Sequence, residues 1–91
     1  MKKRVHAFFS GTVQGVGFRF TAERIASLAR VTGWVKNLRD GKVEVVVEGE
    51  EDDLKQFLDR IGTGPLRSYI RDVDVSWEEF RDEFDGFGLR F

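Results

Sequence analysis

The chain contains no cysteine, one proline and a single histidine among its 91 residues. The lack of cysteine excludes disulfide bonds, thiolate metal sites and a cysteine nucleophile. His6 alone cannot anchor a metal cluster, and its place in an apolar alternating run favours a structural or surface role. No apolar run approaches the roughly 20 residues of a membrane span, and Met1–Arg4 leads into no signal core. These absences predict a soluble cytoplasmic domain with neither a membrane partner nor a bound metal.

The residues that are present suffice for one folded domain spanning 1–91. Hydrophobic residues make up 41% of the chain, with nine Phe, two Trp and one Tyr, which is enough for a packed core. The net charge of −1 hides an asymmetry, because residues 1–49 carry nine Lys and Arg against four Asp and Glu, whereas residues 50–91 carry six against twelve. An anionic ligand is therefore better received by the first half, although both halves could simply present solvated faces.

The hydrophobic periodicity predicts two helices and five strands. Alternation predicts strands, and the spacing i, i+3, i+4, i+7 predicts helices, in the order β-α-β-β-α-β with a short terminal strand. The strands are expected at 5–10, 34–38, 42–48, 72–77 and 87–91, and the helices at about 21–29 and 50–61. This order is typical of the α+β class, as a ferredoxin-like α/β sandwich with two helices on one face of a mostly antiparallel sheet.

Several local features predict how these elements begin and end. Thr21 is a candidate N-cap of the first helix, and Leu28 widens its apolar stripe. Gly62 is the expected C-terminal cap of the second helix. Lys2–Arg4 is expected to be a frayed terminus, and Glu78-Glu79 a solvated connection.

A glycine-rich loop, Gly11–Arg19, follows the first predicted strand. Gly15 and Gly17 can adopt positive φ, so successive backbone N–H groups can point into one concavity that binds an anion. The following helix adds its positive end, and Arg19 adds a charged fork suited to phosphate oxygens. The alternative is an ordinary strand-to-helix loop with a surface arginine.

Asn37 is the only asparagine in the chain and lies near the end of a predicted strand. Its amide carries an acceptor and two donors, so it can hold a water and an oxyanion together. The alternative, which is commoner, is an asparagine beside a turn that hydrogen-bonds its own backbone.

At these residues the sequence resembles the acylphosphatase family. One signature, G-x-V-Q-G-V-x-x-R, is intact at Gly11–Arg19, and a second, G-W-V-x-N-x-x-D-G-x-V-E-V, is intact at Gly33–Val45. The resemblance implies a ferredoxin-like fold and hydrolysis of acyl phosphates to carboxylate and phosphate (EC 3.6.1.7). It also implies that Arg19 binds the phosphoryl group and that Asn37 orients the attacking water. The phosphate-binding set carried over from the first signature is Gln14, Gly15, Val16, Gly17, Phe18 and Arg19.

These residues can supply the chemistry that such a reaction requires. The leaving carboxylate has a conjugate acid with a pKa near 4, so its departure requires no general acid at neutral pH. In a loose phosphoryl-transfer transition state the water also requires little deprotonation, so positioning and electrostatics suffice. We therefore expect an enzyme that uses no cofactor and no metal. Its expected partner is a small acyl phosphate, with inorganic phosphate as product and inhibitor, and a monomer is expected.

Two further positions, Leu38 and the C-terminal Phe91, bear on the predicted site. Leu38 stands where some family members have Thr, so no hydroxyl is available at that position. The α-carboxylate of Phe91 ends a strand near the loop, and it is predicted to form an ion pair with Arg19.

Other functions are compatible with a ferredoxin-like sheet. Phe8 or Phe9 on the first strand could stack RNA bases, but Lys42–Glu48 lacks the aromatic and basic residues of an RNA-binding strand. A pI of about 5.8 also argues against a large phosphate footprint, so no nucleic-acid partner is expected. A small regulatory domain is a further alternative, as is a module serving a larger carbamoyl-transfer maturation protein, although a domain standing alone favours a free enzyme.

Overall fold

The computed structural model describes residues 1–91 and contains the predicted elements in the predicted order. A short 3-10 helix, η1, precedes the fourth strand as the one additional element. The elements are β1 (Lys2–Gly11), α1 (Phe18–Ala29), β2 (Thr32–Asn37), β3 (Val43–Glu50), α2 (Glu51–Thr63), η1 (Arg67–Tyr69), β4 (Ile70–Glu79) and β5 (Phe87–Arg90).

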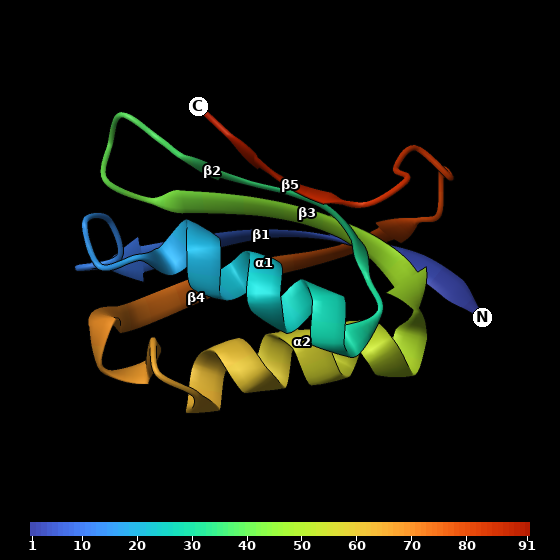
Figure 1. Ribbon diagram of the computed structural model, residues 1–91, viewed down its shortest axis with the longest axis horizontal. Coiled ribbons are helices and arrows are strands. Elements are labelled where there is room, and N and C mark those ends of the chain that lie inside the picture. The colour runs from blue at the N-terminus through green and yellow to red at the C-terminus, as the bar shows by residue number, and fades with distance from the viewer.

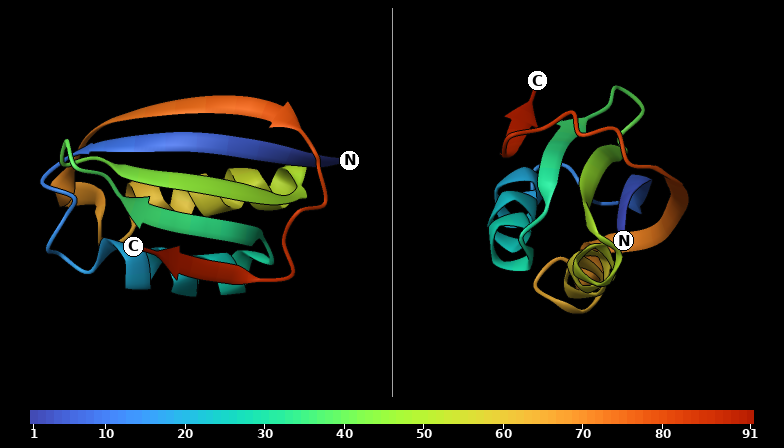
Figure 2. Two further views of the ribbon diagram at one scale, coloured as in Figure 1. Left: turned by 90° about the horizontal axis from the view of Figure 1, so that it is seen from above. Right: turned by 90° about the vertical axis from the view of Figure 1, so that its right-hand side faces the viewer.

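The five strands form one twisted sheet in the order β4-β1-β3-β2-β5 (Figure 2, left). All neighbouring pairs are antiparallel except β2 and β5, which run parallel. Both helices cover the same face of this sheet (Figure 1). The structure therefore confirms the ferredoxin-like α+β fold.

The core lies between the sheet and the helices. Alternate residues of β1 and β3 face the helices, as the period of a strand requires. They pack against the apolar stripes of α1 and α2 in a layer formed by Val5, Ala7, Phe9, Val43, Val45, Val47, Ala22, Ile25, Ala26, Leu54, Phe57 and Ile61. The opposite face of the sheet carries no helix.

Both predicted helix ends require correction. Helix α1 begins at Phe18, with Gly17 as its N-cap in the left-handed region (φ 76°), so Thr21 lies inside the helix instead of capping it. Gly62 lies inside α2, and the C-cap is Gly64, where a Cβ atom would lie 2.5 Å from the carbonyl oxygen of Arg60. Leu28 is 62% exposed and so does not widen the buried stripe of α1.

Lys2–Arg4 is not frayed, contrary to the prediction. Strand β1 begins at Lys2, which pairs with Glu50 of β3, and the amino group of Met1 lies 2.9 Å from a Glu50 carboxylate oxygen. The Arg4 side chain is almost completely buried. The terminus is ordered because residues 2–4 pair with β3 and because distant carboxylates contact Met1 and Arg4.

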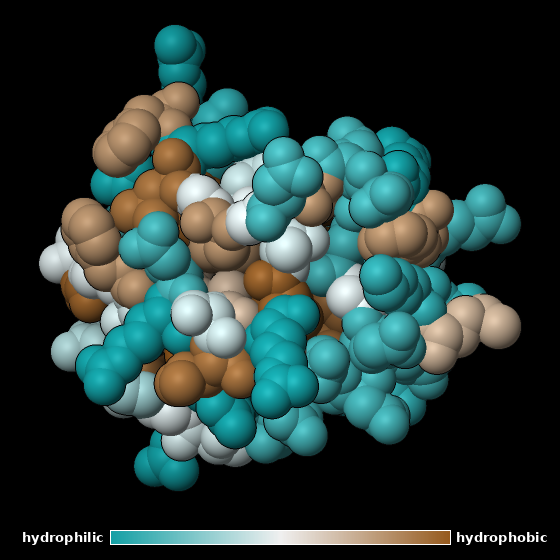
Figure 3. All heavy atoms as spheres, turned by 45° about the vertical axis from the view of Figure 1, so that its right-hand side comes forward, coloured by the Kyte–Doolittle hydropathy of each residue, from teal (hydrophilic) through white to brown (hydrophobic).

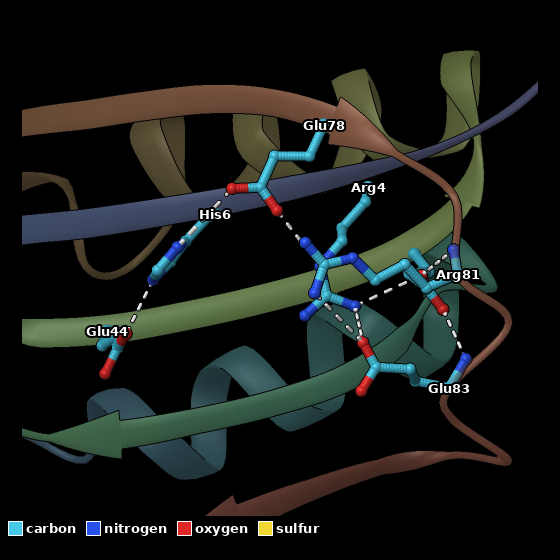
Figure 4. A network of polar contacts seen from close by, with 7 residues as sticks. Arg4, His6, Glu44, Glu78, Arg81 and Glu83 are labelled. Atoms are coloured by element: carbon cyan, nitrogen blue, oxygen red, sulfur yellow. Dashed lines mark hydrogen bonds and ion pairs between the residues drawn. The ribbon is translucent and has the colours of Figure 1, made fainter.

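Three carboxylates form a network around Arg4 on the open face of the sheet (Figure 4). The Arg4 guanidinium contacts Glu48 at 3.3 Å, Glu78 at 3.2 Å and Glu83 at 2.6 Å. The buried Glu48 carboxylate also accepts hydrogen bonds from the backbone N–H groups of Arg81 and Glu83. The network therefore attaches the connection between β4 and β5 to the sheet, and Glu78 belongs to β4 instead of a solvated connection.

The Glu48 network predicts a loss of stability in acid. Burial opposes the charged carboxylate, but the N–H groups of Arg81 and Glu83 and the Arg4 side chain outweigh burial and hold the pKa of Glu48 below its usual range. A carboxyl with a lower pKa in the folded state stabilises the fold above its unfolded pKa, and that contribution is lost as the pH falls. We expect the Tm of the parent to fall more steeply than that of Glu48→Gln from about pH 6 to about pH 3.

Circular dichroism melts across this pH range check the expectation. Glu79→Gln is the matched control, because Glu79 is exposed at the end of the same strand as Glu78 and joins no ion pair. Parallel pH profiles for the parent and Glu48→Gln would show that Glu48 does not carry the acid sensitivity.

The surface is mixed in polarity, and on the face shown in Figure 3 brown hydrophobic residues are interspersed with teal hydrophilic ones. Neither α1 nor α2 has the length and apolar character to cross a lipid bilayer. No cluster of three or more His, Asp or Glu side chains is arranged to hold a metal ion.

Candidate active site

Both sequence motifs lie at one end of the sheet. The loop between β1 and α1, residues 12–17, lies at the same end as the hairpin between β2 and β3, residues 38–42 (Figures 1 and 2). The C-terminal end of β5 approaches this end from the neighbouring edge. The fold thus brings together two motifs that are separated in the sequence.

The loop before α1 presents backbone N–H groups without protein partners. Gly15 and Gly17 have φ of 78° and 76°, the left-handed conformation that lets successive N–H groups converge. None of the N–H groups from Gly15 to Phe20 donates a hydrogen bond within the chain, and the first internal bond of α1 runs from Thr21 to Gly17. No acidic side chain lies in the first turn to neutralise the positive end of the helix. The loop therefore suits an anion.

A cavity of about 120 Å³ opens between this loop and β2. Of the predicted site residues, Gly15, Gly17, Phe18, Arg19 and Asn37 line it. The structure adds two residues that the sequence analysis did not select, Val13 and Phe20. Val13 is buried beneath the cavity, whereas Phe20 is exposed at its rim.

Gln14 and Val16 do not line this cavity. The Gln14 side chain instead donates from Nε2 to the carbonyl oxygens of Leu38, at 2.6 Å, and Lys42, at 2.9 Å. The same two residues close the hairpin through a bond from the Leu38 N–H to the Lys42 carbonyl. Gln14 thus ties the anion-binding loop to the hairpin that follows Asn37, while the Val16 side chain packs against the core.

Asn37 ends β2 opposite Val43 of β3. Its Oδ1 atom is buried and accepts no hydrogen bond from any protein group, its own turn included. Leaving such an acceptor unpaired costs about 1–3 kcal/mol, which a water or ligand donor in the cavity would recover. Near the start of the same strand, position 33 requires glycine, because a Cβ atom there would lie 1.8 Å from the Val46 carbonyl oxygen.

Arg19 lies at the rim of the cavity. Its Nη1 donates to the Arg90 carbonyl oxygen at 3.3 Å, and its Cζ lies 4.5 Å from the centre of the Phe91 ring. The predicted ion pair between Arg19 and the Phe91 carboxylate is not formed. The guanidinium is instead held by a backbone carbonyl and an aromatic ring, which orient it without neutralising its charge.

The first strand does not offer the aromatic surface that RNA binding requires. Phe9 is 2% exposed and packs in the core against Phe18, so the stacking role considered for it is wrong. Phe8 lies on the open face, but its neighbours across the two adjacent strands are Glu44 and Asp74. Two carboxylates beside the ring would repel a phosphate backbone.

A larger cavity, of about 630 Å³, lies between β4 and the start of α2. Trp77 is its one apolar lining residue, and side chains of both charges surround it, namely Lys3, Lys55, Glu51, Glu78 and Glu79. It contains no residue of either motif. The cavity lined by both Arg19 and Asn37 is the candidate active site, because it joins residues of the two motifs.

Comparison with known proteins identifies the family of this chain. The family model for acylphosphatase matches residues 5–89. An acylphosphatase of Salinibacter ruber is 43% identical over 89 residues, which cover 98% of this chain and 94% of that protein. The crystal structure of the Bacillus subtilis acylphosphatase matches over 100% of both chains, with 32% identity and a TM-score of 0.91. The T. kodakarensis HypF structure matches 98% of this chain with 32% identity and a TM-score of 0.84, within 12% of its own length. This chain belongs to the acylphosphatase family.

Proposed function

We propose that this chain hydrolyses acyl phosphates to a carboxylate and inorganic phosphate, in a reaction that requires no metal ion. The observation that carries the proposal is one small cavity bordered by unpaired N–H donors, a guanidinium and an unpaired amide oxygen. The donors match the phosphoryl group, and the oxygen matches a water molecule.

In this proposal the phosphoryl group binds at the glycine-rich loop. The backbone N–H groups of Gly15–Arg19 donate to the nonbridging oxygens, and the Arg19 guanidinium neutralises their charge. These donors are held by the loop and by the start of α1 before the substrate arrives. The transition state is therefore stabilised without reorganisation of the site.

The attacking water is assigned to Asn37. Its Oδ1 would accept a proton of the water and direct the oxygen lone pair toward phosphorus, in line with the leaving carboxylate. An amide oxygen is a weak base, but a loose transition state requires little deprotonation of the water. Orientation is therefore the contribution expected from Asn37.

The lining of the cavity selects the type of leaving group. It contains glycines, apolar side chains, Arg19 and Asn37, and so has no side chain that could protonate a leaving oxygen near neutral pH. A carboxylate leaves without such help because its conjugate acid has a pKa near 4, whereas a phenoxide, like the Tyr side chain, has one near 10. The site therefore suits anhydrides and not esters.

The proposal also covers inhibition by the product, the oligomeric state and the location in the cell. Inorganic phosphate fits the same donors, so the product is expected to compete with the substrate. We also expect a monomeric enzyme formed by a single domain of residues 1–91. A cytoplasmic location completes the proposal. Light scattering and cell fractionation test the last two points.

Phosphate release from benzoyl phosphate and from phenyl phosphate, both in excess chelator, tests the proposed function. We expect turnover of benzoyl phosphate, with the ester hydrolysed at least about 100-fold more slowly, the scale of general acid catalysis. A folded protein that releases phosphate from benzoyl phosphate no faster than buffer does would refute the proposal.

A further inference from the structure

Phe20 is an exposed aromatic side chain at the edge of the candidate active site. It is the third residue of α1, its side chain is 68% exposed, and it lines the cavity together with Arg19 and Asn37. The neighbouring Phe18, by contrast, is buried and packs against Phe9. An aromatic ring beside the cavity can bury its face against a bound substrate, so the position of Phe20 is relevant to binding.

The size of the cavity indicates where the rest of the substrate lies. Sites that enclose a whole small molecule usually measure about 300–1,000 Å³. The cavity here, at about 120 Å³, is well below that range, so it suits the phosphoryl group alone. The acyl group must then extend past the rim.

The rim offers an apolar surface to this acyl group. Val13 and Phe18 are buried, so Phe20 is the one large apolar side chain of the lining that remains accessible. The exposed Phe91 ring lies nearby against Arg19, 4.5 Å from Cζ. No carboxylate or ammonium group lines the cavity to meet a charged acyl substituent.

We propose that Phe20 contacts the acyl group and makes the enzyme favour acyl phosphates with aromatic or large apolar acyl groups over those with small ones. The inference rests on the proposed function and names the substrate class for that site. An aromatic ring or a long alkyl chain would bury the face of Phe20, whereas an acetyl group would reach little of it. Phe20 is thus a specificity-determining residue that takes no part in the chemical step.

Leu28 provides a matched comparison on the same helix. It is 62% exposed, similar to Phe20, but lies near the C-terminal end of α1 and lines no cavity around the motifs. Exposure of an apolar residue is common and has no meaning by itself. The position of Phe20 at the cavity distinguishes it from Leu28.

The test measures kcat/KM for benzoyl phosphate and for acetyl phosphate in the parent, Phe20→Ala, Phe20→Leu and Leu28→Ala. We expect the benzoyl-to-acetyl ratio to fall roughly tenfold in Phe20→Ala, the scale of an aromatic contact, and less in Phe20→Leu. Leu28→Ala should leave the ratio unchanged. The inhibition constant of inorganic phosphate reports on the loop alone, and it should stay within about twofold in Phe20→Ala.

An unchanged ratio in an active Phe20→Ala enzyme overturns the acyl contact and leaves the proposed function intact. A ratio that falls together with a weaker phosphate inhibition also overturns it, because Phe20 would then act by shaping the start of α1. A folded parent that hydrolyses neither substrate refutes the proposed function, and the role of Phe20 is refuted with it.

Discussion

Replacing Asn37 with Ala is expected to lower kcat for an acyl phosphate at least about 100-fold, the loss that follows removal of one preorganised stabilising group. KM and the inhibition constant of phosphate should change little, because the loop and Arg19 remain in place. The Oδ1 atom is buried without a protein partner, so its removal should leave the Tm unchanged or raise it. Steady-state kinetics and thermal melts of the same preparations measure both quantities.

Lys36→Ala is a suitable control, since Lys36 precedes Asn37 on β2 and does not line the cavity. Its kcat should stay close to that of the parent. If Asn37→Ala keeps near-normal activity, Asn37 does not position the water. If its Tm drops sharply, the lost activity reflects the fold and not the chemical step.

Replacing Arg19 with Ala is expected to lower kcat/KM at least about 100-fold and to weaken inhibition by phosphate as well. The guanidinium is the one charged group that lines the cavity, so its loss affects both the bound phosphoryl group and the transition state. Arg19→Lys keeps the charge without the planar fork, and we expect an activity between those of the parent and Arg19→Ala.

Arg24→Ala controls for the removal of one positive charge from α1. Arg24 is exposed, forms no ion pair and lies outside the cavity. The two variants have equal net charge, so a long-range effect of charge on substrate capture would appear in both. Equal activities of Arg19→Ala and Arg24→Ala would contradict a direct contact between Arg19 and the phosphoryl group.

The order of the elements was predictable because the signals for it are local. The apolar spacing in α2 lies within a short stretch of sequence, and the structure follows it. The start of α1 was not predictable in this way, because a glycine in the left-handed conformation caps the helix instead of Thr21. The order of the Lys2–Arg4 segment depends on partners that are distant in sequence, namely strand β3 and the carboxylates around Arg4.

The candidate site was also predictable only in part. The glycines, Arg19 and Asn37 belong to contiguous motifs, so sequence alone could select them. The cavity at which they meet also involves Phe20, a residue whose exposure only the packed structure reveals. The contacts of Arg19 with the Arg90 carbonyl and the Phe91 ring also depend on the folded chain, because they require β5 to pair with β2.

Hydrolysis of benzoyl phosphate in ¹⁸O-labelled water, in excess chelator, tests the central claim most directly. If the phosphoryl group is held at Gly15–Arg19 and Asn37 directs water at phosphorus, the bond between phosphorus and the bridging oxygen breaks. Mass spectrometry should then find the label in the phosphate and none in the benzoate. Label in the benzoate would show attack at the carbonyl carbon, and it would contradict the assignment of both the phosphoryl site and the water.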